Sequence, residues 1–334
     1  MRAVVLSEPG GAWAVQERPE PEPEADEVLV EVVASGVCYT DHRQAIDPAY
    51  GTTYPRIPGH EPIGRVLALG RDVTHLRVGD LVGAAYAQRW CGACRYCELG
   101  RYEHCAACVY TGITVDGGHA ERAVFHARST VQIPSGIDPL EAAPLMCAGF
   151  TAYSGLCDLA LRPGERCAVV GVGGLGHLAV QYAAALGVEV VAVTHSPDKA
   201  ESLRELGAHE VLVVDAVTTL GQGLAAMGGT DAILYAGNAI GHDVLHGLRP
   251  YGRLSLLGVT EEEIGVAPRD MVFGKFQIFG SSQGPRHRLA EMLALHLRSG
   301  AHTQVEAYPL SRASDAYARV AHGSPRYRVV LSPA

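Results

Sequence analysis

The sequence predicts an α/β protein with two domains, a barrel-like β domain followed by a doubly wound parallel sheet. The chain has 334 residues, which corresponds to about two domains at roughly 150 residues each. Up to residue 150, short valine-rich runs are separated by turn signals, as in small β-barrels. From residue 151 on, strand-like runs alternate with helix-length segments, as in doubly wound sheets.

The predicted β domain consists of short strands between frequent turns. Turn signals such as Val78-Gly79-Asp80 divide it. The alternation of proline and glutamate over Pro19–Glu24 predicts an exposed extended loop, because proline fits neither a helix interior nor a central strand. The strand-like runs are Arg2–Leu6, Val28–Val33, Gly64–Leu69, Asp80–Ala85 and Ala120–Phe125.

The second half of the chain predicts six parallel strands joined by helical crossovers. The strands are expected at Arg166–Val170, Val188–Val193, Val211–Val213, Asp231–Tyr235, Arg253–Leu257 and Phe276–Gly280. The helices are expected at Leu175–Leu186, Asp198–Leu206, Val217–Met227 and Gly241–Leu248. A last strand at Tyr327–Leu331 is expected to rejoin the first domain. The predicted domains are therefore residues 1–150, 151–280 and a returning segment, 281–334.

Composition restricts the class of protein. Lys and Arg number 27 and Asp and Glu number 36, so the formal net charge is −9, which argues against a nucleic-acid binder. No apolar run approaches the roughly 20 residues that span a bilayer. The first residues lack the apolar core of a signal peptide, so we expect a cytoplasmic protein. Nine cysteines are an odd number, which fits poorly with a disulfide framework.

Four cysteines lie within fifteen residues, at Cys91, Cys94, Cys97 and Cys105. The two-residue spacings let tight turns bring the sulfurs to about 2.3 Å from one tetrahedral zinc ion, in a closed, structural site. Cys108 is interpreted as a bystander. Two alternatives remain: an iron–sulfur cluster, or four unrelated buried cysteines, which the surrounding glycines and charged residues disfavour.

A second set of possible ligands is scattered over the first half of the chain. Cys38, His60 and Cys147 together supply the Cys, His, Cys set of a catalytic zinc with an open fourth position. Glu61 is expected to enter that position transiently, and Asp41 to accept the other ring N–H of His60. Each residue alone indicates packing at a turn more often than a metal ligand.

The run Gly171-Val172-Gly173-Gly174-Leu175-Gly176 has the pattern G-x-G-x-x-G between a predicted strand and a predicted helix. Gly171 permits the tight turn, Gly173 lets the backbone approach a pyrophosphate, and Gly176 permits close packing of helix on strand. The amino end of the helix then faces the phosphates. The alternative is a glycine-rich turn without a ligand.

These three motifs resemble those of the zinc-dependent alcohol dehydrogenases of the medium-chain dehydrogenase/reductase superfamily. The resemblance extends from Met1 to Leu331. It implies a catalytic domain like a split β-barrel, an inserted Rossmann domain, and an active site between them. It also implies two zinc ions per chain, a nicotinamide cofactor, a small-molecule alcohol or carbonyl substrate, and a homodimer or homotetramer.

The resemblance also assigns roles to single residues. Cys38, His60 and Cys147 match the catalytic zinc ligands, Glu61 matches the exchangeable fourth ligand, and the four clustered cysteines match the structural zinc lobe at about 91–105. Thr40 falls where a hydroxyl touches the substrate oxygen. Thr151 falls near the nicotinamide and Arg328 on the pyrophosphate. Apart from these matches, candidates to line the substrate pocket are Thr40, Tyr50, Tyr86 and Ile113, and the alternative for the two tyrosines is packing in the core.

Two positions depart from the family pattern. Arg43 stands where many members have a proton-relay histidine, so either His42 or water is expected to carry the proton. The second Rossmann strand ends at Thr194 with no acidic residue to bind the ribose. Thr194, His195, Ser196 and Lys199 instead offer donors to a 2′-phosphate, which predicts a preference for NADP over NAD. The alternative is that these residues only begin a helix.

Two other classes of protein are alternatives to this interpretation. A zinc-free, quinone-reductase-like member of the superfamily would lack Cys38, His60 and the four-cysteine lobe. A non-enzymatic zinc-binding structural protein would need neither the G-x-G-x-x-G loop nor an open metal site. The sequence has all of these features and therefore favours the enzyme.

Overall fold

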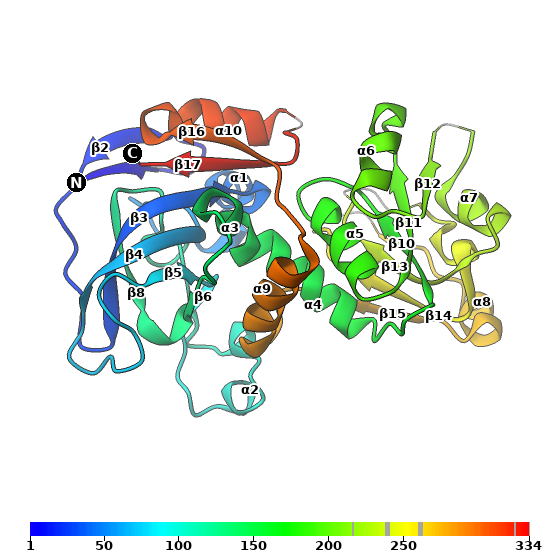
Figure 1. The fold of residues 1–334 in the computed structure, drawn as a ribbon, viewed down its shortest axis with the longest axis horizontal. Coiled ribbons are helices and arrows are strands. Elements are labelled where there is room, and N and C mark those ends of the chain that lie inside the picture. The colour runs from blue at the N-terminus through cyan, green and yellow to red at the C-terminus, as the bar shows by residue number, and fades with distance from the viewer. Residues whose placement is uncertain (216, 238–240, 260–262, 324, 334) are drawn as a thin grey trace. The chain divides into compact units, whose positions relative to one another are not determined.

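The computed structural model describes residues 1–215, 217–237, 241–259, 263–323 and 325–333 (Figure 1). The chain forms two compact units. The first unit contains Met1–Cys147, Pro285–Leu297 and His302–Ala334, and the second contains Ala148–Gly284 and Arg298–Ala301. The expected boundaries at residues 150 and 280 lie within a few residues of this division. The short segment Arg298–Ala301 returns to the second unit.

The first unit is built on a seven-stranded sheet in the order β16-β17-β3-β4-β5-β9, with β8 also paired to β3. The central strand β3 alternates, so that Val28, Val30 and Val32 are buried in one core while Glu31 is exposed. The strands are β3 (Glu27–Val37), β4 (Glu61–Leu69), β5 (Leu81–Ala84), β8 (Arg122–His126), β9 (Thr130–Gln132), β16 (Val305–Pro309) and β17 (Arg328–Ser332).

Two small sheets and several helices complete the first unit. The sheets pair β1 (Arg2–Val5) with β2 (Ala14–Glu17) and β6 (Ala87–Arg89) with β7 (Val109–Tyr110). The helices are α1 (Tyr39–Ile46), α2 (Arg95–Glu98), α3 (Pro139–Pro144), most of α9 (His287–Ser299) and α10 (Ala313–Ala321). The last strand, β17, pairs antiparallel with β3, so the end of the chain lies in the first unit.

The second unit is a six-stranded, wholly parallel sheet in the order β12-β11-β10-β13-β14-β15. This is the strand order of the doubly wound dinucleotide-binding fold, so the predicted fold class is confirmed. The strands are β10 (Arg166–Val170), β11 (Glu189–Thr194), β12 (Glu210–Val213), β13 (Thr230–Tyr235), β14 (Leu248–Leu256) and β15 (Gln277–Gly280). The helices are α4 (Phe150–Asp158), α5 (Gly176–Ala185), α6 (Ala200–Glu205), α7 (Leu220–Ala226) and α8 (Pro268–Gly274).

One predicted helix is wrong. Over Gly241–Leu248 the chain forms only a short 3-10 turn, Val244–Gly247, and β14 already begins at Leu248. Sheet pairing of Leu248 with Thr230 takes precedence over a segment that has no helical periodicity. The prediction also missed α9, although Leu289, Met292, Leu293 and His296 are buried on one of its faces with helical spacing.

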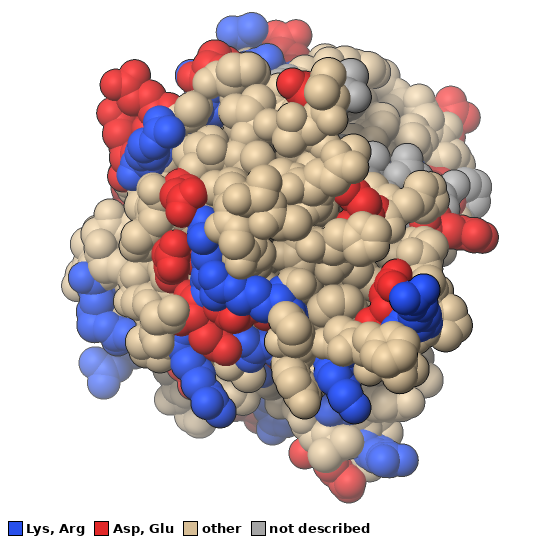
Figure 2. Space-filling view, turned by 90° about the vertical axis from the view of Figure 1, so that its right-hand side faces the viewer, with Lys and Arg blue, Asp and Glu red and all other residues tan. Residues whose placement is uncertain are grey.

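No helix in the described part of the chain has both the length and the apolar character that a membrane crossing requires. Figure 2 shows one face of the molecule, on which acidic and basic side chains lie next to one another between broad uncharged areas.

Candidate metal centres and nucleotide site

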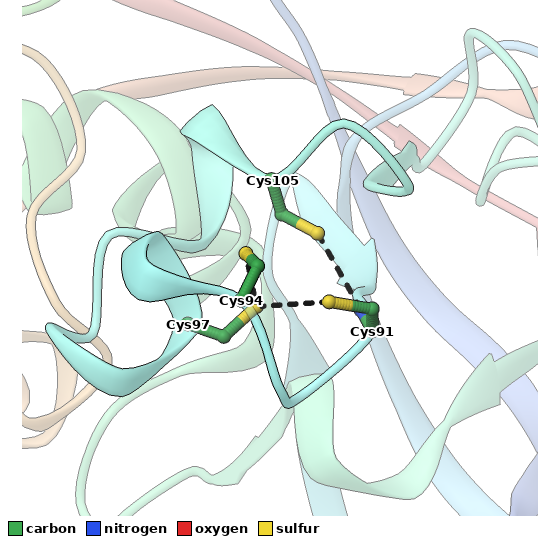
Figure 3. A group of neighbouring side chains, drawn as sticks. All are labelled: Cys91, Cys94, Cys97 and Cys105. Atoms are coloured by element: carbon green, nitrogen blue, oxygen red, sulfur yellow. Dashed lines mark hydrogen bonds between the residues drawn. The ribbon is translucent and has the colours of Figure 1, made fainter.

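The four clustered cysteines converge in the structure (Figure 3). Their sulfur atoms all lie within 4.8 Å of one another. The Sγ of Cys97 is 3.5 Å from that of Cys94 and 3.9 Å from that of Cys91. Sulfurs bound tetrahedrally at about 2.3 Å from one zinc ion would be about 3.8 Å apart, so the cluster fits a closed zinc site. Cys108 is outside this set of four.

Backbone N–H groups around this cluster favour thiolate. Those of Ala93 and Cys94 donate to the sulfur of Cys91 and lower its pKa to about 6. A third N–H, that of Cys91 itself, donates to the sulfur of Cys105 at 3.5 Å. The loop therefore supports negative charge on the sulfur of Cys91, whereas burial raises the pKa of Cys97 to about 12, so metal binding at Cys97 would displace its proton.

A second cluster brings together Cys38, His60, Glu61 and Cys147, whose ligand atoms also lie within 4.8 Å of one another. Cys38 is the residue before α1, and His60 and Glu61 stand at the start of β4. Cys147 lies in the helical segment Leu145–Gly149, almost 90 residues further along the chain. All four residues belong to the first unit, so the fold of this unit alone assembles the set.

Asp41 orients the imidazole of His60 so that its other ring nitrogen is available to a metal ion. Its Nδ1 lies 3.0 Å from Oδ1 of Asp41, and both side chains are buried. Its Nε2 is buried and has no hydrogen-bond partner among the residues that the structure describes. A buried nitrogen without a partner is costly, and with Nδ1 protonated toward Asp41 it offers its lone pair to a metal ion. The donor set of two thiols, one imidazole and one carboxylate therefore fits zinc.

The electrostatics of this second cluster follow from its burial. A hydrogen bond from the Cys147 thiol lowers the pKa of Cys38 well below its usual range, and the same bond, with burial, raises that of Cys147. Burial alone would lower the pKa of His60, but Asp41 and Cys38 outweigh it and raise this pKa, so a metal ion that binds Nε2 would displace a proton from it. Cys38 and Asp41 thus both stabilise positive charge on the imidazole.

Glu61 is paired with Arg328. The strand order places β3 between β17, which begins at Arg328, and β4, which begins at Glu61. The two side chains meet over Gly36 of β3, where a Cβ atom would collide with the Glu61 carboxylate. The expected contact of Arg328 with a pyrophosphate stays a prediction.

The helix α1 presents its residues on different faces. Asp41 and Gln44 are buried on one face. His42 donates to or accepts from the Tyr317 hydroxyl at 2.8 Å, which places it against α10. Two residues correspond to about 200° around a helix, so His42 points away from the side that Thr40 occupies. Arg43, three residues after Thr40 and therefore on its side, lies 3.6 Å from the Asp47 carboxylate.

Aromatic rings lie beside the second cluster. The ring of Tyr86 meets His60 edge-on, with the ring centres 5.6 Å apart, and Tyr110 packs on Tyr86 at 4.9 Å. Burial raises the pKa of Tyr86, so its hydroxyl keeps its proton at neutral pH. Ile113 is 1% exposed. The assignment of Tyr50, Tyr86 and Ile113 to a substrate pocket stays a prediction.

The glycine-rich loop connects β10 to α5 in the second unit. Gly171 has a φ of +85°, which favours glycine. A Cβ on Gly176 would collide with the backbone oxygen of Gly171, whereas one on Gly173 would meet no protein atom within 4 Å. Gly173 thus borders open space at the amino end of α5, as a phosphate site requires. Gly174 and Leu175 complete the loop before α5.

The end of β11 lies beside a cavity of about 380 Å³ in the second unit. Thr194 is buried, and its Oγ1 accepts the N–H of Ser196 at 3.1 Å. His195 lines the cavity, with Nδ1 placed 3.1 Å from the carbonyl oxygen of Val214. Lys199 closes the 3-10 turn Pro197–Lys199. Ser196 stands at the N-cap of that turn, Pro197 is its first residue, and α6 follows directly, as the alternative that this segment begins a helix expects, although the Ser196 side chain makes no capping hydrogen bond.

Other residues around these sites were not singled out from the sequence. The cavity is also lined by Asp215, Thr218, Tyr235 and Asp243. Val214 and Asp215 follow β12, and Tyr235 ends β13, so the carboxyl ends of parallel strands were the available signal. His119 and Ser35, which lie behind Asp41, carried no signal, since each stands alone in the sequence. Thr151 lies on α4, and its proximity to a nicotinamide stays a prediction.

Comparison with known proteins places these motifs in context. The family model described as "Alcohol dehydrogenase GroES-like domain" matches residues 24–135. The model described as "Zinc-binding dehydrogenase" matches residues 174–298. The chain is also 37% identical over 335 residues to an alcohol dehydrogenase of Geobacillus stearothermophilus, covering 99% of each protein.

Solved structures are similar over the same length. A cinnamyl alcohol dehydrogenase of Sorghum bicolor has a TM-score of 0.90 at 28% identity, with 99% of this chain and 97% of that chain covered. A zinc-binding dehydrogenase of Sinorhizobium meliloti 1021 bound to NADP has a TM-score of 0.87 at 26% identity, with 99% of each chain covered.

Proposed function

Because the chain belongs to the zinc-binding alcohol dehydrogenase family of the medium-chain dehydrogenase/reductase superfamily, which interconverts alcohols with aldehydes or ketones, we propose a zinc site and a cofactor for it. One zinc binds at Cys38, His60 and Cys147, and the hydride acceptor is NADP⁺ in preference to NAD⁺. The buried, unpartnered Nε2 of His60 among the sulfur donors is the observation that supports the zinc site best.

When bound, zinc supplies a Lewis acid for the substrate oxygen and the nicotinamide accepts or returns the hydride. Asp41 holds the imidazole of His60 by its Nδ1 and so keeps Nε2 directed at the centre. Cys38 and Cys147 supply two sulfur donors. Arg328 balances the buried charge of Glu61.

Proton transfer begins at Thr40. Its hydroxyl accepts the proton of the alcohol and donates its own proton onward, so that the side chain is unchanged after one turnover. Because His42 points toward Tyr317 rather than toward Thr40, we propose that water carries the proton from Thr40 to solvent. Arg43 keeps its proton in proteins and cannot titrate in its place.

The preference for NADP(H) rests on the end of β11. An acidic residue there binds the ribose 2′-hydroxyl and would repel a 2′-phosphate, but this chain has Thr194, with His195 on the adjoining cavity wall. The NADP-bound relative of Sinorhizobium meliloti is consistent with this preference. No arginine stands between Thr194 and Lys199, so the preference is modest, about one to two decades, or about 1.4 to 2.8 kcal/mol.

The test is kcat/KM for NADP⁺ and NAD⁺ at a saturating alcohol. Thr194→Asp is expected to shift the ratio toward NAD⁺, and Thr194→Val, which removes the hydroxyl without adding charge, is the matched control. A wild-type value for NAD⁺ equal to or above that for NADP⁺ contradicts the preference.

Two further proposals concern stoichiometry. The four-cysteine cluster binds a second, structural zinc, so metal analysis should find two zinc ions per chain. The protein is a homodimer or homotetramer, which sedimentation equilibrium would distinguish from a monomer.

A substrate panel of primary, secondary and aromatic alcohols identifies the preferred substrate.

A further inference from the structure

His119 is a buried histidine behind the candidate zinc centre that the proposed chemistry does not use. It lies in the segment between β7 and β8 and is 0% exposed. Its backbone is held on both sides: its N–H donates to the carbonyl oxygen of Pro58 at 3.0 Å, and its own carbonyl oxygen accepts the N–H of Val4 at 2.8 Å.

The imidazole ring of His119 is wedged between fixed groups. The Trp13 ring packs on it, with the ring centres 5.0 Å apart. On another side the ring lies against Gly59, where a Cβ atom would collide with it. The backbone of Gly59 immediately precedes His60, so the position of the His119 ring and the position of His60 depend on the same stretch of chain.

The two ring nitrogens of His119 have different surroundings. Nδ1 lies 2.8 Å from the hydroxyl oxygen of Ser35. Nε2 faces Oδ2 of Asp41 at 4.0 Å and has no hydrogen-bond partner among the described residues. A distance of 4.0 Å is too long for a hydrogen bond, so the interaction with Asp41 is between a charge and a dipole.

This arrangement determines which nitrogen carries the proton. If Nδ1 were protonated, the lone pair of Nε2 would face a buried carboxylate, which is repulsive. If the Ser35 hydroxyl donates to Nδ1, Nε2 carries the proton and its N–H dipole points at Asp41, which is attractive. Burial lowers the pKa of His119 to about 4, so the ring is neutral near pH 7.

Asp41 links this ring to the metal ligands. Its Oδ1 accepts from Nδ1 of His60 at 3.0 Å and from Nε2 of Gln44 at 3.2 Å. Its Oδ2 accepts the backbone N–H of Cys38 at 2.7 Å and is the oxygen that faces His119. The His60, Gln44 and Cys38 N–H groups thus all donate to this carboxylate, and His119 faces it from beyond hydrogen-bond distance.

We propose that His119 is a positioning residue for the zinc centre: its ring, held by Ser35, directs an Nε2–H dipole at Asp41, which in turn holds His60. This inference rests on the proposed zinc site. It explains why an imidazole is buried at this position, since an apolar ring would fill the space without leaving an unpaired N–H.

The experiment measures zinc release to a chromophoric chelator from the full-length, zinc-loaded enzyme. The release phase that is missing in Cys38→Ala identifies the centre at His60. His119→Phe keeps a ring against Trp13 but removes the N–H, and we expect it to weaken zinc at this centre about tenfold, as loss of outer partners does. Zinc at the four-cysteine cluster should be unchanged.

Two further variants separate positioning from packing. His119→Gln places an amide N–H where Nε2 stood and should restore most of the affinity. His296→Phe, which replaces another buried histidine, is the matched control and should leave the zinc phase unchanged. The absorption spectrum of the Co²⁺-substituted enzyme should change in His119→Phe and return in His119→Gln, and kcat should fall more than KM rises.

If His119→Phe does not fold, Ser35→Ala tests the same link by removing only the donor to Nδ1, with an expected weakening of two- to fivefold. Unchanged zinc release in His119→Phe, or in Ser35→Ala where it replaces it, overturns the inference, as does an equal loss in His119→Gln. If zinc release from the wild-type enzyme shows no phase that Cys38→Ala lacks, the proposed zinc site itself is overturned.

Discussion

Arg328 directs one guanidinium nitrogen, Nη2, at both carboxylate oxygens of Glu61, at 2.5 Å from Oε1 and 2.7 Å from Oε2. The two residues are 267 positions apart in the sequence, and the Glu61 side chain is 0% exposed. Burial raises the pKa of Glu61 to about 8, and the positive charge of Arg328 opposes this shift. The ion pair therefore ties the last strand of the chain to the candidate metal centre.

Removing one partner of this pair should be strongly destabilising. Arg328→Leu leaves Glu61 buried without its counter-charge. Because burial raises the pKa of Glu61 to about 8 even beside Arg328, we expect the free energy of unfolding measured above pH 8, where Glu61 is ionised, to fall by about 3 to 5 kcal/mol. Urea unfolding measures it. The double variant Glu61→Gln/Arg328→Leu should lose less than Arg328→Leu alone, because no unpaired charge remains. A loss in Arg328→Leu of only about 1 kcal/mol, typical of an exposed pair, would contradict the assignment.

The two cysteine-containing centres should be functionally separate. Cys38→Ala should abolish turnover and leave a folded protein with about one zinc per chain. Cys97→Ala should first lower stability or assembly, because a structural zinc contributes directly to the free energy of folding. Zinc content, thermal unfolding and turnover of the two variants decide the matter. Near-full activity in Cys38→Ala would show that the catalytic site is wrongly placed.

Proton release should not depend on His42. The His42 side chain lies against Tyr317, so His42→Ala is expected to leave the pH profile of kcat for alcohol oxidation unchanged. Thr40→Val, which removes the hydroxyl on the other side of α1, should lower kcat by about 10²- to 10⁴-fold, the range for a positioned acid–base group. A shifted pH profile in His42→Ala would place His42 in the relay.

His296 should make the protein less stable in acid. It is buried on α9, and burial, with His302 nearby, lowers its pKa to about 4. The unfolded chain, with a pKa of about 6.5, binds the proton more readily. The stability is therefore complete above about pH 6.5 and falls by roughly 3 kcal/mol as the pH drops toward 4.

The measurement is urea unfolding of His296→Leu between pH 7 and pH 4. The variant should show a shallower loss of stability than the wild type, by up to one proton per chain. The exposed His104 offers a control, since His104→Leu should follow the wild-type curve. Equal slopes for His296→Leu and wild type would refute the prediction.

Local patterns were sufficient for much of this protein. The strand, glycine-rich loop and helix around Gly171 and Gly176 could be predicted because their requirements concern neighbouring residues. The same holds for Cys91, Cys94, Cys97 and Cys105, whose spacing within one loop almost forces the sulfurs together. Cys38, His60 and Cys147 are more distant from one another. Each alone is a weak signal, so the sequence indicated them as a set by their combined ligand chemistry and by resemblance to a family.

Relationships between distant segments required the tertiary structure. The strand order β17-β3-β4 brings Arg328 to Glu61 over Gly36, and no local pattern encodes that order. The packing of α1 on α10 turns His42 toward Tyr317, although position in sequence placed it beside the relay site. His119 also faces Asp41 only because the folded chain brings their two distant segments together. Sequence spacing specifies which chemistry is available, but burial and strand order decide which charged groups face one another.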